Sequence, residues 1–91
     1  MVSSRLKYQY GITLDEYEAM LRSQNGVCAL CNKGETRTHN GKTTRLVVDH
    51  DHVSGDVRAL LCHNCNVMIG HSGDDPTLLR SAAAYIERGG L

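Results

Sequence analysis

A run of four acidic and imidazole side chains follows directly on an apolar stretch in the middle of the chain: Asp49, His50, Asp51 and His52. A hard cation such as Mg²⁺ takes one or two carboxylate oxygens, keeps several waters and accepts a substrate phosphate. Asp49 together with the amide oxygen of Asn66 would supply such a half-open shell. An imidazole such as that of His50 is suited to take a proton from water, because histidine titrates close to neutral pH. From residue types alone, a metal-scavenging cluster and a solvated loop remain open alternatives.

Two C-x-x-C pairs, Cys28 with Cys31 and Cys62 with Cys65, have the spacing of a four-thiolate zinc site. Two such turns complete a tetrahedral shell and leave no open position, so this zinc would be structural. Two disulfides are the alternative. Zinc is favoured because the N-terminus lacks the apolar segment of a secretory signal, and paired cysteines in a reducing cytoplasm favour a metal.

The composition predicts a small apolar core that needs the additional stabilisation of a zinc site or of disulfides. The chain has 91 residues, no Trp or Phe and four Tyr, which suits a single domain over residues 1–91. No apolar run approaches the roughly 20 residues that span a bilayer, so we expect a cytoplasmic protein with no membrane partner. The formal net charge is zero, so binding to DNA would depend on local basic charge.

A first helix is expected over residues 14–24. Thr13 and Glu16 form a capping box at its start, and Asn25-Gly26 ends it through backbone conformations that these residue types tolerate. Residues 1–12 before it are expected to form an extended arm, which carries Tyr8 and Tyr10.

A polar hairpin is expected around Asn40-Gly41, because both residues tolerate positive φ. The segment from Lys33 to Arg45 holds four basic residues and one acid. A basic ribbon of this kind can lie along a phosphate backbone, and a solvated hairpin with ordinary surface charges is the alternative. The residues that would contact nucleic acid are Arg37, Lys42 and Arg45.

Two strands and a helix are expected next. Apolar residues predict strands at 46–48 and 57–61, joined by a turn at 53–56. Residues 62–69 fit a short helix that ends at Gly70. The order is therefore strand, loop, strand, helix, with Asp49 and His50 where the first strand gives way to the loop.

A last helix is expected to start at Asp74-Asp75-Pro76, since Pro suits the first turn and acids suit the positive end of the helix dipole. Its apolar stripe predicts a helix that packs against the body of the domain. The stripe consists of Leu78, Leu79, Ala82, Tyr85 and Ile86.

The chain resembles the recombination endonuclease VII branch of the HNH (His-Me finger) nucleases. The resemblance covers roughly residues 8–88. It rests on the Asp-His-Asp-His run, the stretch Gly-Asp-Val-Arg-Ala-Leu-Leu-Cys at 55–62, Cys65-Asn66 with Gly70 behind it, and the upstream elements Tyr10-Gly11-Ile12-Thr13 and Gly26-Val27-Cys28.

That resemblance implies an α+β fold with a ββα-metal core, a four-cysteine structural zinc site and flanking helices. It implies that Asp49 and Asn66 bind one catalytic divalent cation, usually Mg²⁺, with Mn²⁺ or another divalent cation as the alternatives, and that His50 is the general base for cleaving DNA. His52 would touch phosphate or a metal-bound water, or brace the loop. Arg58 would bind phosphate, or pair with Asp51 or Asp56.

We therefore expect a Mg²⁺-dependent DNA endonuclease that either nicks one strand or cuts both strands. We expect it to be encoded by a phage or another mobile element. Its oligomeric state, monomer or homodimer, stays open. The alternative is a noncatalytic zinc-stabilised module that binds DNA or a protein, and an RNA-cutting or toxin nuclease would share the same chemistry. Asp49, His50 and Asn66 distinguish a nuclease from a noncatalytic binding module, because a binding module needs the four cysteines but not these three residues.

Overall fold

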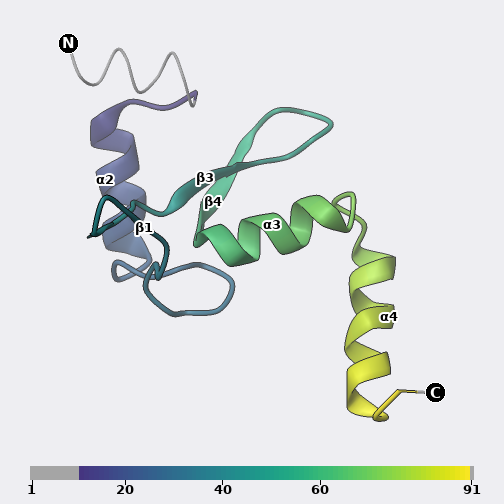
Figure 1. Ribbon diagram of the computed structural model, residues 1–91. Helices are drawn as coiled ribbons and strands as arrows, with labels where there is room; N and C mark the ends of the chain where they lie inside the picture. Colours follow the sequence, from purple (N-terminus) through teal and green to yellow (C-terminus); the bar gives the residue numbers. More distant parts are fainter. Residues whose placement is uncertain (1–10, 91) are drawn as a thin grey trace.

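The computed structural model describes residues 11–90, and its elements follow in the order α2, β1, β2, β3, β4, α3, α4 (Figure 1). Within these residues the chain has three helices and two separate two-stranded antiparallel sheets, so the predicted α+β class is confirmed. The predicted N-terminal arm, with Tyr8 and Tyr10, lies outside the described residues except for its last two positions. No helix within residues 11–90 has the length and apolarity to cross a membrane.

Helix α2 spans Leu14–Ser23 and begins at the predicted capping box. The Glu16 backbone N–H donates to Thr13 Oγ1 at 3.1 Å, and the Thr13 N–H donates to Glu16 Oε1 at 2.7 Å. The helix ends as predicted, with Asn25 and Gly26 at φ values of 57° and 74°. Its buried residue is Tyr17, whose hydroxyl donates to the backbone oxygen of Leu46 at 2.6 Å. This bond ties α2 to the entrance of the central sheet.

The central sheet pairs β3 (Val47–His50) with β4 (Val57–Leu61). Val48 lies opposite Leu60, and both side chains are buried. β3 runs further than the predicted strand 46–48, so Asp49 and His50 belong to the strand and not to the loop after it. The core joins α2, this sheet and the cysteine pairs, and its buried members are Ile12, Tyr17, Cys28, Leu46, Val48, Leu60, Leu61 and Cys62.

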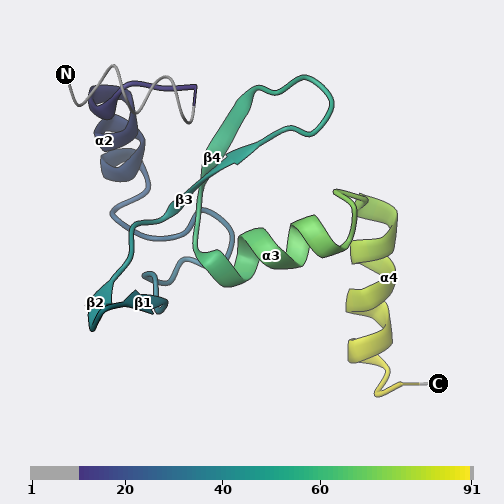
Figure 2. The ribbon, with the colours of Figure 1, turned by 45° about the horizontal axis from the view of Figure 1, so that its top comes forward.

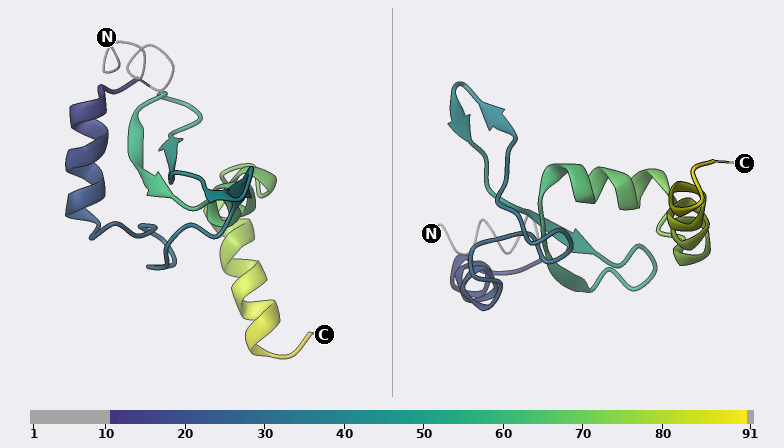
Figure 3. Two further views of the ribbon diagram at one scale, coloured as in Figure 1. Left: turned by 60° about the vertical axis from the view of Figure 1, so that its left-hand side comes forward. Right: turned by 90° about the horizontal axis from the view of Figure 1, so that it is seen from below.

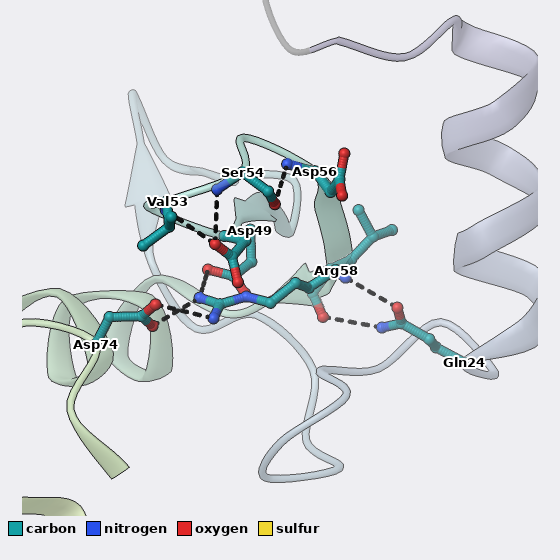
Figure 4. A network of polar contacts seen from close by, with 9 residues as sticks. Gln24, Asp49, Val53, Ser54, Asp56, Arg58 and Asp74 are labelled. Atoms are coloured by element: carbon teal, nitrogen blue, oxygen red, sulfur yellow. Dashed lines mark hydrogen bonds and ion pairs between the residues drawn. The ribbon is translucent and has the colours of Figure 1, made fainter.

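The Gln24 side chain pairs with the backbone of β4 in the manner of a neighbouring strand. The Leu60 N–H donates to Gln24 Oε1 at 2.9 Å, and Gln24 Nε2 donates to the Leu60 oxygen at 2.9 Å. Nε2 also donates to the oxygen of Val27 at 2.8 Å. Figure 4 shows this amide reaching from the end of α2 to the sheet. Gln24 therefore joins α2, the first cysteine turn and β4.

Replacing Gln24 by Ala is expected to destabilise the fold by about 1–3 kcal/mol, because it leaves the buried backbone groups of Leu60 without this partner. Urea unfolding of the zinc-loaded protein would measure the loss. Arg22→Ala, on the exposed surface of the same helix, is the control and should stay within about 0.5 kcal/mol of the parent. Equal stabilities for the two variants would contradict a bracing role for Gln24.

The second sheet is the predicted hairpin, β1 (Thr38–His39) with β2 (Lys42–Thr43). Its turn residues Asn40 and Gly41 have φ values of 52° and 77°, as a two-residue hairpin turn requires. All four strand residues are exposed. Figure 2 shows this ribbon apart from the β3–β4 hairpin, so it faces solvent as the sequence predicts.

Helix α3 spans His63–His71, and the prediction that it ends at Gly70 is wrong. Gly70 lies inside the last turn, where a helix tolerates glycine at a cost of about 1 kcal/mol. The chain leaves the helix through Gly73 and Asp74, which have φ values of 72° and 62°. The backbone N–H of Asp74 still donates to the Ile69 oxygen at 3.0 Å, which fixes this turn against the helix end.

Helix α4 spans Pro76–Glu87 and starts where predicted, with Asp75 as its N-cap. The prediction that its apolar stripe packs against the body is wrong. Leu78, Tyr85 and Ile86 are 51%, 51% and 74% exposed. Figures 1 and 3 show α4 leading away from the end of α3 and lying far from α2. Periodicity identifies the apolar face of a helix but not what covers it.

Candidate metal centre and active site

The four cysteines converge on one point, as predicted. The Sγ atoms of Cys28, Cys31, Cys62 and Cys65 all lie within 4.8 Å of one another. The Sγ atoms of Cys31 and Cys62 are 3.9 Å apart, close to the edge of about 3.8 Å that a tetrahedron with Zn–S bonds of about 2.3 Å requires. Bonded sulfurs would be about 2.05 Å apart, so the set is not a pair of disulfides. The cluster has the donors and the spacing to bind zinc.

Backbone N–H groups point at these sulfurs and prepare them for a cation. The N–H of Leu30 donates to Cys28 Sγ at 3.4 Å, and that of Cys65 donates to Cys62 Sγ at 3.5 Å. Burial raises the pKa of the Cys28 thiol, but the surrounding N–H groups outweigh burial and lower that pKa to about 6. Burial, followed by the neighbouring sulfurs, raises the pKa of Cys65. A negative charge on the Cys28 sulfur disfavours ionisation of the neighbouring thiols. A bound dication would remove this repulsion.

The cysteine cluster fixes the start of α3 relative to the rest of the domain. Cys62 is the N-cap of α3, so the first turn of the helix directly follows a residue of the four-cysteine cluster. Glu35 adds a second restraint, because its Oε1 accepts from the His63 N–H at 2.8 Å at the positive end of the helix dipole. Sequence reading missed this role of Glu35. The arrangement holds Asn66 in a defined place, half-buried on α3, which contacts β3.

Asp49 is the buried polar residue of the described core, at 6% exposure, and its carboxylate pairs with Arg58 (Figure 4). Arg58 Nε donates to Asp49 Oδ2 at 2.7 Å, and Arg58 Nη2 donates to Oδ1 at 3.1 Å. Two parallel bonds of this kind make a strong, directional ion pair. The expectation that Arg58 pairs with Asp51 or Asp56 is therefore wrong. The Asp49 carboxylate, which could be a ligand for a metal cation, is therefore already paired with the positive charge of Arg58.

A break in the sheet register explains how Arg58 reaches Asp49. The pairing passes from Asp49 opposite Ala59 to His50 opposite Val57, which leaves Arg58 as an extra residue on β4. Such a bulge re-aims the side chain of the extra residue. Sequence patterns of alternating strand residues do not reveal a bulge, so the partner of Arg58 was not predictable from periodicity.

Asp74, in the turn between α3 and α4, is the second partner of Arg58. Its Oδ1 accepts from Arg58 Nη2 at 2.9 Å, and its Oδ2 accepts from Nη1 at 3.1 Å. The hydrogen bonds that Arg58 donates, first to Asp49 and then to Asp74, raise the pKa of its guanidinium, and the bond accepted from Arg58 lowers the pKa of Asp74. Sequence reading placed Asp74 only at a helix start. Asp74 has a left-handed φ, as does Gly73 before it, so both residues belong to the turn by which the chain leaves α3.

The remaining acid of the run, Asp51, organises the turn between β3 and β4. Its Oδ1 accepts from the N–H groups of Ser54 at 2.9 Å and Val53 at 2.8 Å. These bonds, the Ser54 N–H first, lower the pKa of Asp51. His52 is exposed in the same turn. Asp51 is thus a turn residue rather than a ligand candidate.

In the described part of the chain the Asp49 carboxylate accepts hydrogen bonds from Arg58. His50 is half-buried at the end of β3. A Cβ added at Gly11 would lie 3.8 Å from His50 Nε2, so the backbone passes close to this ring. The structure brings together Asp49, Arg58 and Asp74, and it carries His50 on the same strand as Asp49.

Of the three predicted nucleic-acid contacts in and beside the β1–β2 hairpin, two have partners within the chain. Arg37 Nη1 lies 3.3 Å from His63 Nδ1, and the Arg45 guanidinium lies 5.8 Å from the ring centroid of Tyr17. Lys42 is exposed near the tip of the hairpin. The three residues remain accessible at the surface, since Arg37 and Arg45 are also exposed.

Fold and site define a small α+β domain in which paired cysteines gather beside a two-stranded sheet that carries a buried carboxylate. The sequence matches the recombination endonuclease VII family over residues 3–88, and the chain belongs to this family. It is 41% identical to the Gene 59 protein of Mycobacterium phage D29 over 86 residues, which cover 93% of this chain and 49% of that protein.

A second relative, the Gene 59 protein of Mycobacterium phage L5, is 40% identical over 84 residues, which cover 91% of this chain and 48% of that protein. The chain thus spans about half the length of the curated relatives it matches. No solved structure matches the chain.

Proposed function

We propose that the protein is a metal-dependent endonuclease that hydrolyses DNA phosphodiester bonds within a ββα-metal unit formed by β3, β4 and α3. The observation that carries the proposal is the buried Asp49 carboxylate at the end of β3, in a chain of the endonuclease VII family. An ionised carboxylate is costly to bury unless a cation compensates it. In a catalytic site that binds a divalent cation and a phosphate, a buried carboxylate can serve as a ligand of the cation.

The donor chemistry of Asp49 and Asn66 fits a catalytic Mg²⁺ or Mn²⁺. Both side chains offer hard oxygen ligands, and one carboxylate with one amide leaves room for waters and a substrate phosphate. In the structure the Arg58 guanidinium engages both oxygens of Asp49, so a divalent cation at this position would have to displace it. When bound, the cation would stabilise negative charge on the phosphate in the transition state.

The chain itself would supply the base and the phosphate contacts. His50 accepts the proton of the attacking water, whose oxygen bonds to phosphorus as the bond to the 3′ oxygen breaks, and the leaving 3′ oxygen takes up a proton from solvent. Products therefore carry 5′-phosphate ends. Arg58 binds a phosphate oxygen, His52 touches the phosphate or a bound water, and the hairpin residues Arg37, Lys42 and Arg45 follow the DNA backbone.

Zinc in the four-cysteine cluster has a structural role in this proposal. A shell of four thiolates has no open position for a reacting water, so the zinc holds α3 and Asn66 in place. The active unit is a monomer or a homodimer. Its setting is the cytoplasm of a bacterial host, which is supported by the phage origin of the relatives.

Supercoiled plasmid incubated with zinc-loaded protein tests the proposal. We expect conversion to nicked or linear DNA with Mg²⁺ or Mn²⁺, and none when the divalent cation is omitted. Parallel reactions with single-stranded DNA, branched DNA and RNA identify the substrate class. Failure to cleave any of these nucleic acids with either cation would contradict the proposal.

A noncatalytic module that binds DNA or a protein is the second candidate, and the pairing of Asp49 with Arg58 favours it. The Arg58 guanidinium satisfies both oxygens of the buried carboxylate without any metal ion. This module would retain DNA in a gel-shift assay, produce no cleavage, and be indifferent to substitution of His50. Cation-dependent cleavage that is lost with His50 excludes it.

A further inference from the structure

Arg58 is shared between two carboxylates that come from different parts of the fold. Asp49 lies on β3, while Asp74 lies in the turn between α3 and α4, and each offers both of its oxygens (Figure 4). The Nη2 group of Arg58 donates to both acids, at 3.1 Å to Asp49 and 2.9 Å to Asp74. A single guanidinium is thus divided between a candidate metal ligand and a residue with no assigned role.

We propose that Asp74 is a positioning residue of the candidate site: it retains Arg58 when a divalent cation takes over Asp49, and so leaves the guanidinium beside the substrate phosphate. This inference rests on the proposed function. Asp74 itself touches neither the cation nor the reacting atoms. Its role is to weaken the hold of Asp49 on Arg58 and to keep the displaced arginine at the edge of the site.

Charge and geometry carry this inference. Asp49 is almost fully buried, so a dication and a guanidinium on the same carboxylate would repel each other with little screening. The Arg58 side chain is 34% exposed, which gives it room to swing away from Asp49. Asp74 is held in place by its own backbone bond to Ile69 and by the left-handed turn, so it is a fixed anchor for the arginine.

Mn²⁺ alone is the probe, and its affinity for zinc-loaded protein without DNA is measured from the electron paramagnetic resonance signal of free Mn²⁺. Arg58→Gln removes the competitor and should tighten Mn²⁺ binding. Asp74→Asn should weaken it by roughly fivefold, the factor that corresponds to about 1 kcal/mol, because Arg58 then rests on Asp49 alone. Asn also suits the positive φ of this position.

The double variant decides the mechanism. With Arg58→Gln already present, Asp74→Asn should no longer change the Mn²⁺ affinity, because the arginine through which Asp74 acts is gone. Asp56→Asn, which removes the same charge from an exposed position nearby, is the control and should have little effect in either background. Zinc content and circular dichroism establish that each variant is folded.

Equal weakening by Asp74→Asn with and without Arg58 would overturn the inference, since it would make Asp74 a ligand or a simple source of negative charge. Absence of Mn²⁺ binding in Arg58→Gln protein, or binding that survives Asp49→Asn, would overturn it as well. The plasmid assay distinguishes this failure from that of the proposed function. Cation-dependent cleavage without coupling between Asp74 and Arg58 leaves the nuclease standing.

Discussion

His50→Ala is expected to lower the rate of plasmid cleavage by about 10²–10⁴-fold, the usual contribution of a general base. His50 is half-buried at the end of β3, next to Asp49 in sequence and close to the backbone of Gly11. The variant removes the proton acceptor but none of the cysteines and none of the buried apolar core. We therefore expect unchanged zinc content and an unchanged circular dichroism spectrum alongside the loss of rate.

His71→Ala is the matched control, because His71 is an exposed imidazole at the end of α3. It should cleave plasmid at the parent rate. Addition of free imidazole is expected to restore part of the rate of His50→Ala and to leave the control unaffected. Undiminished cleavage by folded His50→Ala protein would show that another group accepts the proton.

Removal of zinc is expected to unfold the protein. Structural zinc contributes about 10–16 kcal/mol in small zinc peptides, which is as large as the whole stability of about 5–15 kcal/mol of an ordinary domain. The core here is small, and two of its buried members, Cys28 and Cys62, belong to the four-cysteine cluster that could hold the zinc. Circular dichroism during titration with a strong zinc chelator should show loss of helix as zinc leaves.

Cys62→Ala should have the same effect, because it removes a candidate zinc ligand and the side chain that caps α3 together. Ala29→Ser, which adds a hydroxyl at an exposed position of the first cysteine turn, is the control and should keep its zinc and its fold. A weak chelator that removes Mg²⁺ alone should stop cleavage without changing the spectrum. A zinc-free protein with the parent spectrum would contradict a structural role for the cluster.

Local signals in the sequence predicted those parts of the fold that depend on neighbouring residues. The capping box of Thr13 and Glu16, the turn at Asn40-Gly41 and the N-cap Asp75 each involve residues within a few positions of one another. The four cysteines were predictable for another reason. A metal site constrains residue type and spacing within each pair so strongly that the long-range contact can be inferred.

The features that sequence reading missed depend on distant contacts. Arg58 had several acids nearby in sequence, and only the bulge in β4 selects Asp49. Asp74 reaches Arg58 because of the turn after α3, and the exposure of α4 follows from the direction of that same turn. The trio Asp49, His50 and Asn66 was proposed from residue types and family resemblance, and its assembly around a cation stays a prediction.

A crystal structure of zinc-loaded His50→Ala protein with a short DNA duplex and Mn²⁺ tests the central claim most directly. The anomalous signal of Mn²⁺ should lie between the Asp49 carboxylate and the Asn66 amide oxygen, in contact with a phosphate, with the Cβ of residue 50 facing the same phosphate. A cation bound elsewhere, or residues 49, 50 and 66 directed at separate surfaces around intact DNA, would contradict the account.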